Sequence, residues 1–158
     1  MKTIIVGLGN PILGDDGVGW KVAAEVENRL DSLALSPGEK SQLDVAFLSL
    51  GGISLMENLI SYDRAILIDA VTSKEGNGSV NVFELDELPD VSSFHLASAH
   101  DMSLQTALQV GKAMGAKLPE RVTVVGIAIV PVHEFSEELS IPLAQAVSKA
   151  AQIVIELL

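Results

Sequence analysis

Short apolar runs rich in β-branched residues constrain the fold of this chain more than any other feature. They are "TIIVG" at 3–7, "AILIDA" at 65–70 and "RVTVVGIAI" at 121–129. Runs without polar alternation are typical of strands buried on both faces, as in the centre of a parallel sheet. "LDVAFLSL" at 43–50 predicts another strand, and "SVNVFEL" at 79–85 alternates imperfectly, as an edge strand does.

The segments between these runs have the apolar periodicity of helices. From 17 to 30, an apolar residue recurs at every fourth position and forms one stripe of an amphipathic helix. Further helices are expected over 53–60, over 98–114 and after Ser140, which would act as an N-cap with Pro142 in the first turn. The residues expected to face inward from the three longer helices are Val18, Val22, Val26, Leu30, Leu104, Leu108, Ala144, Val147, Ala151 and Val154.

This alternation predicts an α/β fold, with a mostly parallel, twisted sheet flanked by helices on both faces. A length of 158 residues, with 48% hydrophobic and 20% charged residues, suits a single three-layer domain over 1–158. The apolar run at the N-terminus is too short for a signal peptide, and no run approaches the ~20 residues that span a membrane. We therefore expect a cytoplasmic protein without a membrane partner.

Charge and cysteine content limit the partners and the kinds of reactive site that are expected for this chain. The formal net charge of −11 opposes binding to a phosphate backbone, so nucleic acid is not an expected partner. The chain has no cysteine, which excludes disulfides, thiolate metal sites and cysteine nucleophiles. No serine stands in a recognisable order with a histidine and an acid, so we expect attack by water rather than by a covalent nucleophile.

The stretch "VGLGNPILGDDGVG" at 6–19 joins the first expected strand to the first helix. It is not a dinucleotide-binding turn, because Ile12 stands where the third glycine is required and the second strand ends at Leu50 instead of an acidic residue. Asp15 or Asp16 would be favourable as a cap of the following helix. Two adjacent carboxylates exceed what a cap requires, so the second is expected to lie at a ligand site.

Ligands of open α/β sheets bind beyond the carboxyl ends of the strands. Three polar segments are expected there: Asn10–Asp16, Asp69–Lys74 and His95–Asp101. Asp69 follows an apolar run, where an unpaired carboxylate would be costly to bury. An Asp bonded to loop amides is the structural alternative.

His100 is expected at a helix start, where the helix dipole favours the neutral imidazole that can bind a metal. A plain polar loop residue is the alternative for it. Taken together, Asp16, Asp69 and His100 form a three-ligand set with open positions, which suits a divalent ion such as nickel or zinc. His95 and His133 lack a matching carboxylate context.

At this point the chain resembles a known family, the hydrogenase maturation endopeptidases. The resemblance runs through most of the chain and is carried by "GLGNPILGDDGVG" at 7–19, "GGISLMENL" at 51–59, "AILIDAV" at 65–71, "SAHDMSL" at 98–104 and "VVGIAI" at 124–129. It implies a peptidase, formally of the aspartic type, that removes the C-terminal extension of a nickel–iron hydrogenase large-subunit precursor once nickel is in place.

The resemblance also implies roles for individual residues. The nickel-sensing positions fall on Asp16, Asp69 and His100, with Asp16 and Asp69 as the essential carboxylates. The nickel would be supplied by the substrate, and zinc or cadmium could replace it in vitro. Gly51 and Gly52 would keep the backbone close to the substrate tail, although a tight turn after a strand explains them equally well.

Two positions depart from the family pattern. Some members carry an Asp directly before the Gly-Gly pair, where this chain has Leu50, so catalysis is not assigned to that position. Some members have Glu where this chain has Asp16, which keeps the type of ligand and shortens its reach.

Two alternatives remain beside this interpretation. "VGLGNP" also resembles peptidyl-tRNA hydrolase, but that enzyme requires a His-Asn pair soon afterwards, and the first histidine here is His95. The negative charge also opposes tRNA. A non-catalytic chaperone of the nickel subunit would carry the same ligands and stays open.

Overall fold

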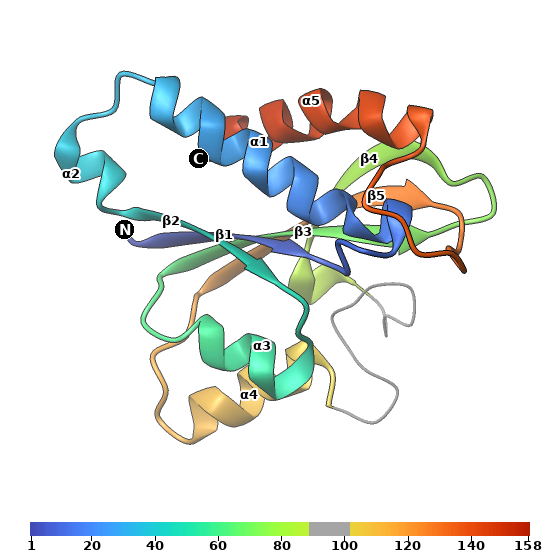
Figure 1. Ribbon diagram of the computed structural model, residues 1–158. Coiled ribbons are helices and arrows are strands. Elements are labelled where there is room, and N and C mark those ends of the chain that lie inside the picture. Colours follow the sequence, from blue (N-terminus) through green and yellow to red (C-terminus); the bar gives the residue numbers. More distant parts are fainter. Residues whose placement is uncertain (89–101) are drawn as a thin grey trace.

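A computed structural model describes residues 1–88 and 102–158 of the chain (Figure 1). The strands in these ranges form one sheet in the order β2–β1–β3–β5–β4. Their bounds are β1 Thr3–Leu8, β2 Leu43–Leu48, β3 Arg64–Thr72, β4 Asn77–Glu84 and β5 Arg121–Ile129. β4 runs antiparallel to β5 at one edge, and the other neighbouring pairs are parallel. The mostly parallel sheet expected from the sequence is confirmed.

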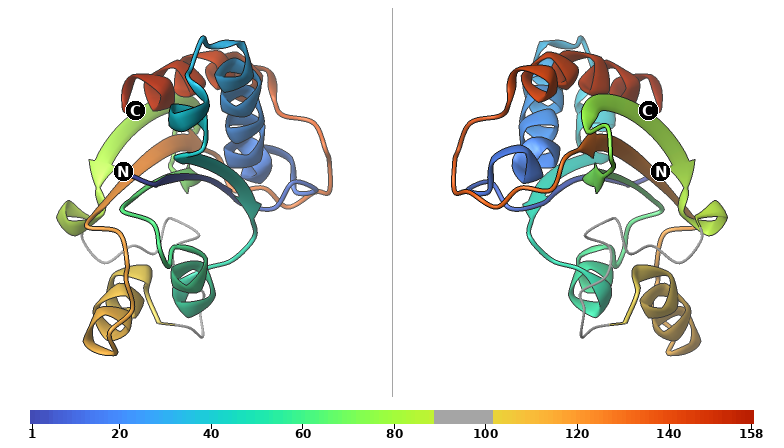
Figure 2. Two further views of the ribbon diagram at one scale, coloured as in Figure 1. Left: turned by 90° about the vertical axis from the view of Figure 1, so that its left-hand side faces the viewer. Right: turned by 90° about the vertical axis from the view of Figure 1, so that its right-hand side faces the viewer.

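Helices cover both faces of this sheet (Figure 2). α1 (Val18–Ser32) and α5 (Ile141–Glu156) pack on one face, and α3 (Gly52–Asn58) and α4 (Leu104–Ala113) lie on the other. The short helical turns are η1 (Gly14–Gly17), α2 (Pro37–Lys40) and η2 (Leu85–Glu87). The three-layer α/β architecture is therefore confirmed. Within the described ranges, no helix combines the length and hydropathy needed to cross a bilayer.

The side chains of the central strands divide between two cores. In β3, Ile66 and Ile68 pack with α1 and α5, whereas Leu67 packs with α3 and α4. These three side chains have no exposed surface. Burial on both faces explains why β3 is an unbroken apolar run without polar alternation.

The strand order reverses between β1 and β3. From β1 the chain passes through α1 to β2, and from β2 it passes through α3 to β3 on the other side of β1. The connections that leave β1 and β3 therefore diverge at the carboxyl ends of these two strands. Such a switch point is where open α/β sheets bind their ligands.

Glycine allows α1 to pack directly on the sheet at this switch point. A Cβ atom at Gly19 would lie 2.3 Å from the carbonyl oxygen of Leu8 and 2.4 Å from that of Ile68. A Cβ at Gly7 would lie 2.6 Å from the carbonyl oxygen of Gly19. Both contacts are with backbone atoms, so the first turn of α1 can approach β1 and β3 this closely only because side chains are absent.

The expected helix over 98–114 is wrong at its start. Helix α4 begins at Leu104, because Ser103 is its N-cap and accepts a hydrogen bond from the Thr106 amide at 3.2 Å. Met102 precedes the cap and is not helical. Leu104 and Leu108 are buried as expected. The part of this expected helix over 98–101, with His100, lies outside the described residues.

Two smaller expectations also need correction. Ala144 is exposed, because the inner face of α5 begins with Leu143 and Ala146 and continues through Ala151 and Val154. Strand β3 continues to Thr72, so Asp69 lies inside a strand instead of opening a loop.

We predict that Gly19→Ala destabilises the protein by about 1–3 kcal/mol or more, because the new methyl group overlaps two carbonyl oxygens. The matched control is Gly38→Ala in α2, where the nearest atom to a new Cβ is the Ser36 Oγ at 4.0 Å. Alanine in a helix should leave stability unchanged or raise it by up to about 1 kcal/mol. Urea unfolding followed by circular dichroism measures both, and equal stability of the two variants would contradict the packing argument.

Candidate functional site

Asp16 is held in the tight turn that follows β1. It lies in η1 with 8% of its surface exposed, and its Oδ2 accepts a hydrogen bond from the Asn10 amide at 2.9 Å. Gly9 has φ +126°, and a Cβ there would lie 2.1 Å from the Asp16 carbonyl oxygen. The turn therefore requires glycine at this position and fixes Asp16 at the carboxyl end of β1.

Asp69 lies in the neighbouring strand β3 and has no exposed surface. It pairs in register with Gly126 of β5, and its position alternates with Ile68, so it belongs to the face covered by α3 and α4. η1, which carries Asp16, contacts β3. Asp69 thus lies in β3 and Asp16 in the turn that follows β1, the two strands that flank the switch point.

The histidines take different places. His100 and His95 lie outside the described residues, so the convergence of His100 with Asp16 and Asp69 stays a prediction. His133 is exposed in the segment after β5. Within the described ranges, no group of three or more His, Asp and Glu side chains could hold a metal ion. A nickel ion at this edge would therefore need ligands beyond these ranges, from His100 or from a substrate.

Asp15 has a structural role that the sequence did not reveal. Its Oδ1 accepts a hydrogen bond from the Ser140 amide and its Oδ2 one from the Ser140 hydroxyl, each at 2.7 Å. The expectation that Asp15 or Asp16 caps the next helix is wrong, because α1 follows η1 directly and its N-cap is Gly17, without a side-chain cap. Ser140 is the N-cap residue of α5, as expected, but its hydroxyl bonds to Asp15 instead of capping the helix.

Backbone bonds extend this attachment along the segment between β5 and α5. The Gly14 amide donates to the Ser136 carbonyl at 2.7 Å, and the Ser136 amide donates to the Ile12 carbonyl at 2.9 Å. The segment of residues 130–140, called here the 130–140 loop, is therefore fastened to the turn that carries Asp16.

Gly51 and Gly52 follow β2 at the same edge of the sheet. Gly52 has φ +53°, a conformation that favours glycine, whereas Gly51 is extended. The Ser49 hydroxyl donates a hydrogen bond to the Gly9 carbonyl at 2.6 Å, which ties this turn to the Asp16 turn. The geometry explains Gly52 as a turn residue, and contact of either glycine with a substrate stays a prediction.

An open groove of about 420 Å³ lies beside Asp69, and no expectation drawn from the sequence included it. Its wall includes Gly126, the register partner of Asp69, and the exposed side chains of Asn77, Ser79 and Asn81 on β4. Ser79 and Asn81 lie on the face of β4 from which Phe83 packs inward, and a register shift separates Asn77 from this alternation. Two polar residues two positions apart, directly before Phe83, are the signal that could have indicated the groove.

The opposite, amino edge of the sheet carries a network of surface charges. Arg121 bonds to Glu84 at 2.6 Å, and this bond lowers the pKa of Glu84. Burial, together with a hydrogen bond to Asp44, raises the pKa of Tyr62 to about 12. These side chains lie where strands β2, β3 and β5 begin, far along the strands from Asp16 and Asp69, and they stabilise the sheet edge.

Comparison with known proteins decides the family. The family model described as "Hydrogenase maturation protease" matches residues 38–157. This chain belongs to the hydrogenase maturation protease family. The resemblance found in the sequence is confirmed, and the family supports a peptidase that processes a hydrogenase precursor. This family membership rules out the peptidyl-tRNA hydrolase alternative.

Individual relatives agree with this membership. The chain is 25% identical over 159 residues to the hydrogenase expression/formation protein HupD of Rhizobium leguminosarum, covering 99% of this chain and 74% of that protein. It is 25% identical over 128 residues to the hydrogenase 2 maturation protease of Escherichia coli K12, covering 80% and 73%. Among solved structures, the hydrogenase maturating endopeptidase HybD from E. coli shares the fold with a TM-score of 0.74 and 21% identity, covering 99% and 91% of the two chains.

We predict that Asp15→Ala releases the 130–140 loop without unfolding the protein. Loss of both bonds to Ser140 should speed hydrogen exchange at the Gly14 and Ser136 amides. These two amides form the backbone bonds that join the 130–140 loop to the Asp16 turn, beside the Asp15–Ser140 bonds. Glu137→Ala is the matched control, since it removes an exposed carboxylate from the same loop. Hydrogen exchange followed by NMR measures this, and unchanged protection in Asp15→Ala would contradict the role of Asp15.

Proposed function

We propose that this peptidase removes the C-terminal extension of a nickel–iron hydrogenase large-subunit precursor after nickel insertion. The observation that carries the proposal is the placement of Asp16 and Asp69. Both are buried, Asp69 in β3 and Asp16 in the turn after β1, the strands that flank the switch point, in a chain of the hydrogenase maturation protease family. We place the reaction in the cytoplasm, with the precursor as partner.

Nickel acts in this proposal as part of the substrate. Asp16, Asp69 and His100 complete the coordination of a nickel ion that the precursor already holds, and cleavage therefore requires a loaded precursor. Carboxylate and imidazole together suit a borderline divalent ion, and the same donors would accept zinc or cadmium in vitro.

Cleavage proceeds by attack of water on the scissile carbonyl. One of the two carboxylates, Asp16 or Asp69, accepts a proton from the water as the new C–O bond forms, and the same carboxyl group then gives this proton to the departing amine as the C–N bond breaks. The role of these carboxylates is what an aspartic-type assignment implies. Binding to nickel at the same edge keeps the scissile bond close to them.

The groove beside Asp69 is suited to an extended peptide tail. The amide side chains of Asn77 and Asn81 can both donate and accept hydrogen bonds, which matches the alternating donors and acceptors of a peptide backbone. Gly51 and Gly52, at the end of β2, would approach the tail on the other side of the Asp16 turn. This arrangement leads the tail past the two carboxylates.

Incubation with matched precursors tests the proposal. We expect nickel-loaded large-subunit precursor to lose its C-terminal extension, as measured by mass spectrometry, and nickel-free precursor to stay intact. Equal cleavage of both forms would contradict the nickel requirement. Stable binding of the loaded precursor without any loss of mass would favour the chaperone alternative.

Single substitutions test the assigned residues. We predict that Asp69→Asn and Asp16→Asn each lower the cleavage rate about 100-fold or more, because an amide supplies neither negative charge nor a general base. His100→Ala should also abolish processing while the protein stays folded, whereas His95→Ala should retain it. The fraction of loaded precursor trimmed at a fixed time measures activity, with circular dichroism as the check on folding. Full activity in folded His100→Ala would show that His100 is not a nickel ligand and would make His95 the candidate for that role.

A further inference from the structure

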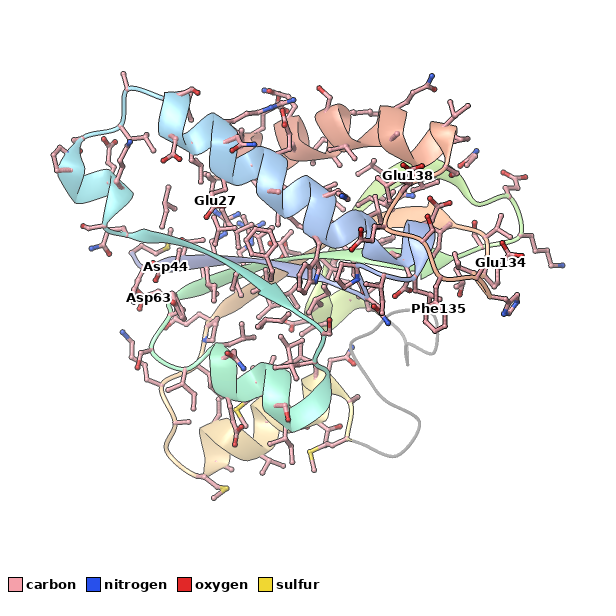
Figure 3. The ribbon with its side chains drawn as sticks, in the orientation of Figure 1. Glu27, Asp44, Asp63, Glu134, Phe135 and Glu138 are labelled. Atoms are coloured by element: carbon pink, nitrogen blue, oxygen red, sulfur yellow. The ribbon has the colours of Figure 1, made fainter. Side chains whose placement is uncertain are left out.

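Large apolar side chains are exposed beside the Asp16 turn. Phe135, in the 130–140 loop, is 82% exposed, and Ile12, whose carbonyl accepts a bond from the Ser136 amide, is about half exposed. Figure 3 shows Phe135 and Glu134 on this loop, at the end of the molecule where β5 leads toward α5. A single exposed apolar residue is ordinary, but two on segments that are bonded to each other form a patch that indicates an interaction surface.

This patch is held in place. Ser136, which follows Phe135, exchanges backbone hydrogen bonds with Ile12 and Gly14, and Asp15 anchors Ser140 at the end of the loop. The backbone that directly follows Phe135 is therefore fixed to the Asp16 turn. An aromatic side chain has only two rotatable bonds, so a fixed backbone makes it an anchor that loses little entropy on binding.

The charged side chains of the 130–140 loop are all negative. Glu134, Glu137 and Glu138 lie in the same loop, and residues 130–140 contain no lysine or arginine. All three glutamates are exposed. A partner that covers Phe135 must therefore bring basic groups to the rim of the contact, because like charges at an interface are repelled.

We propose that the 130–140 loop, together with Ile12, is the surface on which the hydrogenase precursor docks. An apolar recess of the precursor receives Phe135, and lysine or arginine side chains around that recess face Glu134, Glu137 and Glu138. The proposal rests on the proposed function. The loop is bonded to the turn that carries Asp16, so a precursor docked here lies next to the carboxylates that would cleave it.

A second copy of this chain is a poorer occupant of the surface. It would carry the same three glutamates and the same net charge of −11. Self-association through this face would bring like charges together.

Kinetics with nickel-loaded precursor test the docking surface. We expect Phe135→Ala to raise KM roughly tenfold or more with little change in kcat, as for loss of a central aromatic anchor that acts on binding alone. Met114→Ala is the matched control, because Met114 at the end of α4 is also 82% exposed and lies away from the Asp16 turn. It should leave both constants unchanged.

A second variant tests the charge of the rim. The triple substitution Glu134→Gln, Glu137→Gln and Glu138→Gln should raise KM at low salt, and the difference from the wild type should shrink at high salt. A KM that stays equal to that of the wild type at every salt concentration would overturn the requirement for a basic partner.

The outcomes separate this inference from the proposed function. If the wild type trims the precursor and Phe135→Ala does so with the same KM, the docking surface is wrong and the proposed function stands. If the wild type neither trims nor binds the precursor, both are wrong. A dimer of the wild type in sedimentation experiments that dissociates in Phe135→Ala would assign the surface to a second copy and overturn the inference.

Discussion

The closeness of α1 to the sheet is the constraint on which the candidate site depends. Gly19 lies against the carbonyl oxygens of Leu8 and Ile68, at distances that leave no space for a side chain. Because the helix begins this near to β1 and β3, the chain between β1 and α1 has to fold back within a few residues. That short return places Asp16 over the end of β1, one strand away from Asp69. Glycine packing thus determines where the two carboxylates lie.

Elements defined by local patterns could be predicted from the sequence. The strand over 121–129 has the predicted bounds, because an unbroken apolar run has no stable place except between two layers of helices. The stripe of Val18, Val22, Val26 and Leu30 is buried, since a four-residue period fits one face of a helix. The placement of Asp16 and Asp69 at one end of the sheet followed from the rule for parallel strands, which needs only the order of elements along the chain.

Features that depend on contacts between distant residues could not be predicted. The bond between Asp15 and Ser140 joins residues 125 positions apart, and two adjacent aspartates do not reveal which of them faces inward. Helix α4 begins later than predicted because Ser103 is its N-cap, and apolar periodicity does not mark the position of a cap. The polar groove also depends on which face of β4 turns toward Asp69, and that face is set by pairing with β5.

The bonds between Asp15 and Ser140 also link the site to the order in which the chain is made. Asp15 leaves the ribosome well before Ser140, which follows it by 125 residues. The turn that carries Asp16 gains this attachment only after β5 has been synthesised and α5 has begun to follow it. A nascent chain, even one whose first strands have paired, therefore lacks the anchor that holds this turn until the 130–140 loop has been made, and the candidate site is completed only then.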